Sequence, residues 1–121
     1  MKTPEQITNS LVKEFDKLND IREQSLKLSR EIIKSCSKSI RNVHRNNLDE
    51  AKQHLDEANK NYQDLRSSLK DIPELRFAGY VNDSERELIE AFLVFEFEKT
   101  NSLLEFEGMN VSASNYIQGL G

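Results

Sequence analysis

The sequence predicts an all-α protein, a helical bundle with long antiparallel N-terminal helices. The 121 residues include only four Gly and two Pro, and 31% of them are charged. No Gly or Pro interrupts the chain between Pro4 and Pro73. Apolar residues in 48–72 recur at steps of three and four, which is the heptad pattern of packed helices. A chain of this length is expected to form one domain, spanning residues 1–121.

The first predicted helix runs from Pro4 to about Arg45, a span of roughly 60 Å at 1.5 Å per residue. Thr3 can cap its N-terminus, Pro4 suits the first helical position, and Gln6 follows three residues after the cap. The pair Asn46-Asn47 is the first plausible break. We therefore expect the chain to turn back on itself directly after this helix.

The second predicted helix runs from about Leu48 to Asp71. Because the connection to the first helix is short, the two should pack antiparallel along an apolar seam. The residues of that seam are Leu48, Ala51, Leu55, Ala58, Tyr62, Leu65, Leu69 and Ile72.

The sequence pattern of the C-terminal part of the chain predicts a connector and two further helices. Residues 72–80 are expected to form the connector, with a short helical turn. Asn82, Asp83 and Ser84 are candidate caps for a third helix over about 83–101, whose first turn is acidic as the helix dipole favours. A fourth helix is expected to begin at Ser112 or Ser114.

The charge distribution is uneven along the chain. The net charge is −4, yet residues 22–45 carry seven Lys or Arg against two Glu, whereas residues 71–121 are strongly acidic. A single cysteine, Cys36, cannot form an internal disulfide, and no signal-type or membrane-spanning apolar run is present. These features predict a cytoplasmic protein with no membrane partner.

The basic segment predicts a cationic ridge on one side of the first helix. At about 100° per residue, its cations share one face, opposite Ile32, Cys36 and Val43. Such a face can follow a phosphate backbone, although a solvated face neutralised by nearby acids is an equal alternative. The segment has no aromatic residue for base stacking, so Tyr62, Tyr80 and Phe77 are the candidates for that role. The predicted nucleic-acid-binding residues are Arg30, Lys34, Lys38, Arg41 and Arg45, with Lys27 on the same face.

Glu87 and Glu90 form the second candidate site, because they lie three residues apart within the apolar stretch 88–97. Helical geometry brings the two carboxylates to one side, and the apolar stretch predicts that the helix is buried. Buried carboxylates are costly unless they are paired, protonated or bound to a metal, so the pair predicts a Mg²⁺ or Mn²⁺ site. The alternative is that the acids face water or pair with a cation of a neighbouring helix. No Gly-rich phosphate loop and no Cys/His set for zinc or nucleophilic catalysis is present.

Five segments, in three regions of the chain, resemble the translin family. Residues 28–33 (Leu-Ser-Arg-Glu-Ile-Ile) and 40–45 (Ile-Arg-Asn-Val-His-Arg) resemble its first helix. Residues 87–91 (Glu-Leu-Ile-Glu-Ala) and 97–103 are similar to the acidic helix of translin-associated factor X. Residues 115–119 (Asn-Tyr-Ile-Gln-Gly) resemble the start of the family's next helix. The resemblance covers almost the whole chain.

The resemblance implies an all-helical subunit of a hollow oligomer that encloses single-stranded RNA or DNA. It assigns Glu87 and Glu90 as metal ligands and catalytic residues of a Mg²⁺- or Mn²⁺-dependent endoribonuclease. The chain departs from the family in two respects. The family's Arg/His-rich stretch is reduced here to residues 75–77, and the family's C-terminal helices, which supply a further acidic ligand, are lacking.

We therefore expect either a truncated chain or a homo- or hetero-oligomer in which a separate C-terminal half completes the site. Glu98 is the candidate substitute for the missing ligand. The alternatives are a non-catalytic nucleic-acid-binding subunit and a purely structural helical bundle.

Overall fold

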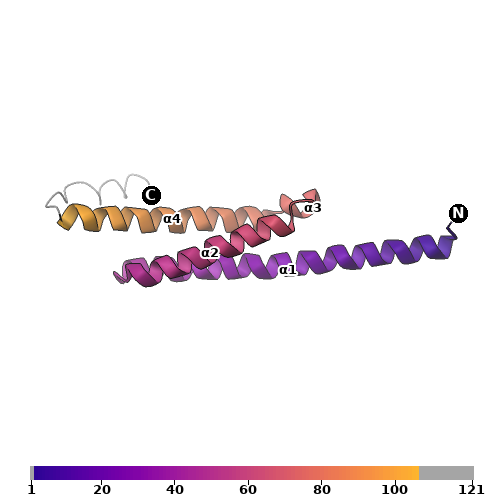
Figure 1. The fold of residues 1–121 in the computed structure, drawn as a ribbon, viewed down its shortest axis with the longest axis horizontal. Helices are drawn as coiled ribbons and strands as arrows, with labels where there is room; N and C mark the ends of the chain where they lie inside the picture. The colour runs from indigo at the N-terminus through magenta and orange to yellow at the C-terminus, as the bar shows by residue number, and fades with distance from the viewer. Residues whose placement is uncertain (1, 107–121) are drawn as a thin grey trace.

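The computed structural model describes residues 2–106, which form four α-helices and contain no strand (Figure 1). The helices are α1 (Pro4–His44), α2 (Leu48–Ser68), the short α3 (Pro73–Arg76) and α4 (Gly79–Phe106). The predicted all-α bundle with long antiparallel N-terminal helices is confirmed. None of the described helices is long and apolar enough to cross a membrane. The predicted helix from Ser112 lies outside the described residues.

α1 begins as the sequence predicts. The Thr3 hydroxyl accepts a hydrogen bond from the Gln6 backbone N–H at 3.2 Å, and the Gln6 side chain accepts one from the Thr3 N–H at 3.0 Å. This reciprocal capping box satisfies two N–H groups that the first helical turn leaves unpaired. α1 ends at His44, and the chain reverses through Asn46, whose φ of 61° lies in the left-handed region that Asn tolerates.

α1 and α2 pack antiparallel along the predicted seam. The seam residues of α2 are buried, and Leu48 and Ile72 at its ends are partly buried. The Ser39 hydroxyl of α1 donates to the Ala51 carbonyl of α2 at 2.8 Å, which aligns the two helices near the turn. α2 ends at Ser68 rather than at Asp71, because Ile72 precedes a proline and adopts a non-helical conformation.

α4 begins four residues earlier than predicted. Ser84 does not cap the helix: it is fully buried, its hydroxyl donates to the Tyr80 carbonyl at 2.9 Å, and it lies in hydrogen-bond contact with the Ser29 hydroxyl of α1. The Ser29 hydroxyl also lies 3.0 Å from the Tyr80 carbonyl oxygen, and it can donate its single proton either to that oxygen or to the Ser84 hydroxyl. These bonds dock the first turns of α4 on α1, so the segment continues as a helix back to Gly79.

α1 is much longer than the bundle that covers it. Figure 1 shows its N-terminal half extending beyond α2, α3 and α4. Side chains over residues 5–20 are exposed except for Ser10, which is half-buried, whereas those facing the other helices from Ser25 onwards are buried. The core therefore sits at the C-terminal half of α1.

Candidate nucleic-acid interface and acidic pair

The cationic ridge lies on the open side of α1. Ser29, Cys36 and Val43, spaced seven residues apart, are buried toward the other helices. The predicted binding residues occupy the opposite side, where all are exposed except Lys38, which is half-buried. The ion pairs among residues 2–106 include none of them. The ridge is therefore a solvated cationic face that forms no ion pair with a carboxylate of the described residues. The residues of the ridge are Arg30, Lys34, Lys38, Arg41 and Arg45.

The acid pair, Glu87 and Glu90, is more exposed than the sequence indicated. Glu87 is half-buried and Glu90 is exposed. Their apolar neighbours Ile89 and Phe92 are also exposed, each to about half of its surface. The prediction of a buried helix is wrong because only one side of α4 packs on the bundle, along Val81, Ala91 and Phe95 and the buried Ser84. Without burial, the two carboxylates do not require a metal for their stability.

Glu87 faces α1. Burial raises the pKa of the Cys36 thiol to about 11, and the Glu87 carboxylate adds to this rise, so Glu87 lies near Cys36. Counted from the buried Ala91, Glu87 is rotated by about 40° and Glu90 by about 100° in the same direction. Leu88 is rotated by about 60° in the other direction, toward α2, whose residues share a groove with it. The acid pair therefore lies on the α1 side of α4, with Glu90 turned outward.

The ridge and the acid pair border the same open side of the α1–α4 contact. α1 and α4 run parallel, as the colours in Figure 1 show. Ser39 marks the side of α1 that contacts α2. Rotation from Cys36 away from Ser39 leads to Arg30 at about 120° and Arg41 at about 140°. The structure thus places two cations of the ridge and the two acids, which are distant in sequence, along one face.

The described residues do not complete a metal site. No group of three or more His, Cys, Asp or Glu side chains that could hold a metal occurs within residues 2–106. Glu98, the predicted substitute ligand, follows Glu90 by eight residues, about 12 Å along the helix, so both cannot reach one ion. Two carboxylates fit the hard oxygen ligands that Mg²⁺ takes when water and phosphate supply the rest. The acid pair is therefore a partial site at most.

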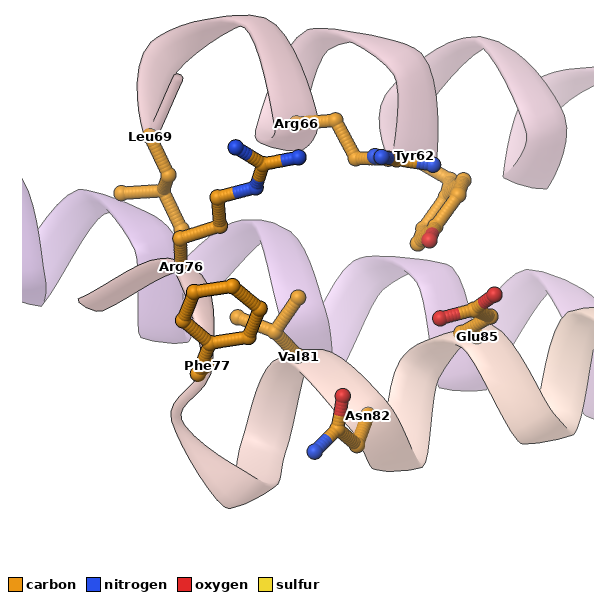
Figure 2. A pocket seen from close by; sticks show the side chains of 8 residues that line it. All are labelled: Tyr62, Arg66, Leu69, Arg76, Phe77, Val81, Asn82 and Glu85. Carbon is orange, nitrogen blue, oxygen red and sulfur yellow. The ribbon is translucent and has the colours of Figure 1, made fainter. Parts of the chain in front are cut away.

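A pocket of about 150 Å³ between α2, α3 and α4 was not predicted (Figure 2). The Arg66 guanidinium lies 6.0 Å from the Tyr62 ring centre, and the Arg76 guanidinium lies 5.5 Å from that of Phe77. In the sequence, the pocket could have been recognised only from two arginine–aromatic pairs. Tyr62 and Arg66 are four residues apart on α2, and Arg76 and Phe77 are adjacent at the end of α3. The residues that line the pocket are Tyr62, Arg66, Leu69, Arg76, Phe77, Val81, Asn82 and Glu85.

The pocket combines two cations, one acid and two aromatic rings. Burial and the Glu85 carboxylate raise the pKa of Tyr62, and Arg66 opposes that rise, so the phenol stays protonated at neutral pH. Phe77 is 71% exposed, so its ring is open to a ligand. Tyr80, the third aromatic candidate, is not part of this pocket, and its hydroxyl is buried without a hydrogen-bond partner among residues 2–106. The arrangement suits a planar anionic ligand.

The chain is similar in sequence to an archaeal protein. An uncharacterized protein of Methanocaldococcus jannaschii is 33% identical over 114 residues, which are 93% of this chain and 50% of that protein. The chain thus spans about half the length of the relative it matches. No protein-family profile and no solved structure matches the chain. The resemblance to the translin family remains a prediction from the sequence.

Proposed function

We propose that this chain binds single-stranded RNA or DNA through the cationic ridge, as a subunit of a helical oligomer. The observation that carries the proposal is the exposed row of cations on α1, which forms no ion pair within the described part of the chain. From Arg30 to Arg45 the ridge extends about 22 Å, enough to contact several phosphates. Release of the counterions of those phosphates would drive binding.

The arginine–aromatic pocket favours a single strand over a duplex. The exposed ring of Phe77 and the guanidinium of Arg76 can stack on a base only when that base is unpaired. The pocket contains no residue of α1, and the ridge faces away from the other helices. The two surfaces would therefore hold different stretches of a strand, which suits an oligomer that encloses its ligand.

The acid pair supports a further proposal, that the oligomer is a metal-dependent endoribonuclease of the cytoplasm. Glu87 and Glu90 would contribute two carboxylates to Mg²⁺ or Mn²⁺, and a separate C-terminal half would contribute the rest. A bound divalent cation would supply Lewis-acid stabilisation of the charge that develops on the phosphate. The ridge, beside the acid pair, would position the strand. The exposure of Glu90 and the lack of a third ligand within residues 2–106 favour the alternative of a non-catalytic binding subunit.

A charge-reversal experiment tests the binding proposal. The double variant Lys34→Glu/Arg41→Glu should weaken binding to a fluorescent single-stranded RNA and lower the slope of log K against log salt by about 1.4. The matched control, Lys60→Glu/Lys70→Glu, makes the same change of charge at two exposed sites away from the ridge. It should leave the slope of log K against log salt unchanged. If both doubles lower the slope equally, binding depends on net charge and the ridge is not the contact surface.

A second experiment tests the endoribonuclease proposal. Glu90→Gln keeps the size of the side chain and removes the charge that a divalent cation needs. In the oligomer, this change should abolish Mg²⁺- or Mn²⁺-dependent cleavage of single-stranded RNA while RNA affinity changes less than about twofold. Glu50→Gln, at an exposed site on α2 away from the acid pair and the ridge, is the control. Cleavage by Glu90→Gln at the parental rate would exclude the acid pair from the chemistry, and absence of metal-dependent cleavage in the parent would favour the binding subunit.

A further inference from the structure

The N-terminal half of α1, which extends beyond the other described helices, carries an exposed apolar stripe. We name this set the projecting stripe, and it consists of Ile7, Leu11, Phe15 and Leu18, which are 47%, 61%, 69% and 38% exposed. Four large apolar side chains in a row on one helix face form the kind of exposed patch that marks an interaction site. The charged and polar residues of this half lie mainly on its other sides.

The projecting stripe continues the buried face of the same helix. Leu11, Leu18, Ser25 and Ile32 follow one another at intervals of seven residues, so they lie on nearly one line along α1. Ser25 and Ile32 at the end of that line are buried against the bundle, whereas Leu11 and Leu18 are exposed. The stripe therefore has the pattern of a face that packs in a helical bundle, but it is exposed in this chain.

A second unfilled apolar surface lies between α2 and α4. It is a groove of about 420 Å³ that includes no residue of α1. Ile89 and Phe92 on its wall are 52% and 51% exposed. Two cations and two acids border it, of which Lys52 and Asp56 pair with each other at 3.3 Å. The residues that line the groove are Lys52, Leu55, Asp56, Asn59, Leu88, Ile89, Phe92, Phe95, Glu96 and Lys99.

We propose that the projecting stripe of one copy of this chain occupies the α2–α4 groove of a second copy, and that the second copy reciprocates. The bond between Ser39 and Ala51 aligns the two antiparallel helices, so the groove segment 52–59 lies beside about residues 31–38 of α1. A two-fold axis near residue 24, the middle of α1, brings residues 10–17 of the partner to that level. One symmetry operation therefore fills both grooves.

The dimer has three further consequences that agree with the structure. Each set of α1, α2 and α4 gains a fourth helix, which is the common closed arrangement of such bundles. Glu14, about 60° from the line of the stripe, comes near the α2 border of the groove, where Lys52 offers a cationic partner. The cationic ridge stays open because it lies on the other side of α1, so the dimer does not depend on the proposed RNA binding.

The mass of the chain in solution tests the dimer. Light scattering coupled to size exclusion should give twice the 14.0 kDa of one chain. Leu11→Asp/Phe15→Asp in the stripe, and separately Phe92→Asp in the groove, should each raise the dissociation constant by roughly a hundredfold. The control Asn9→Asp/Lys13→Asp places acids on the opposite side of the same helical segment and should leave the dimer intact. Circular dichroism checks that each variant keeps its helices.

Mixing the two disruptive variants tests reciprocity. Each variant alone pairs an altered surface with an intact one at both contacts. A mixed dimer of Leu11→Asp/Phe15→Asp with Phe92→Asp has one wholly intact contact, so the mixture should dimerise more strongly than either variant alone. A monomeric parent chain would overturn the proposal. So would a dimer that Phe92→Asp leaves unchanged, since the stripes would then pair with each other, or dimerisation that mixing does not improve.

Discussion

The two halves of α1 share one helix and one heptad register, yet only the C-terminal half of the apolar face is buried against the other described helices. The C-terminal half, which is buried in the bundle, contacts its neighbours largely through small side chains, with Ser25, Ser29, Ser35 and Ser39 all buried. The N-terminal half presents Leu and Phe to solvent. Small residues allow helix backbones to approach closely, and their hydroxyls bond carbonyls of neighbouring helices or of their own helix. Large residues need a groove to fill. The comparison teaches that hydrophobicity alone does not identify the covered part of a helix.

The largest expected difference between the halves is in the cost of deleting an apolar side chain. Ile32→Ala should lower the free energy of unfolding by about 2–4 kcal/mol, because it leaves a cavity in the core. Leu11→Ala, at concentrations where the chain is monomeric, should change it by less than about 0.5 kcal/mol. Urea denaturation followed by circular dichroism measures both. Equal losses at high dilution would show that the N-terminal half packs within its own chain.

A smaller effect is expected from enlarging a serine. Ser39→Leu should destabilise the chain by about 1–3 kcal/mol, because the new side chain must displace α2 and the bond to the Ala51 carbonyl is lost. Ser10→Leu makes the same change in the projecting half, where it should be nearly neutral. Thermal unfolding of the two variants compares them. A harmless Ser39→Leu would mean that α1 and α2 are not in close contact there.

The smallest effect concerns the protonation of Cys36. Its pKa in the folded chain, about 11, is raised above the ordinary 9.0, so the folded state keeps the proton more tightly than the unfolded state. This contribution to stability is full below about pH 9 and is lost as the pH rises toward 11. Cys36→Ala should therefore show a flatter decline of stability over pH 9–11 than the parent.

Thiol labelling extends that comparison to the two halves. At neutral pH, Cys36 should react slowly with a thiol reagent, because it is fully buried and protonated. In a Cys36→Ala background, Leu18→Cys in the projecting half should react far faster when the chain is dilute. Rapid labelling of Cys36 in the folded parent would contradict the burial that raises its pKa.

Much of the fold followed from local patterns. The capping box at Thr3 and Gln6, the long interval without Gly or Pro, and the seam on α2 predicted α1 and α2 to within a few residues. The start of α4 did not follow, because Ser84 has the chemistry of a cap and only its contact with Ser29 shows that it is buried. The exposure of Glu90 could not be predicted from the sequence either, since a helix that is apolar on most sides has the pattern of a buried helix.

Helix periodicity and capping act over a few neighbouring residues, so the order of the amino acids predicts the fold class, the positions of the long helices and the one-sided row of cations on α1. Contacts between segments that are distant in the chain set the remaining properties. These are which part of each apolar face is covered, how Arg66 and Arg76 meet in one pocket, and which side the acid pair shares with the ridge. The length of α1 relative to α2 and α4 is the physical reason that one half of its apolar face is buried and the other projects.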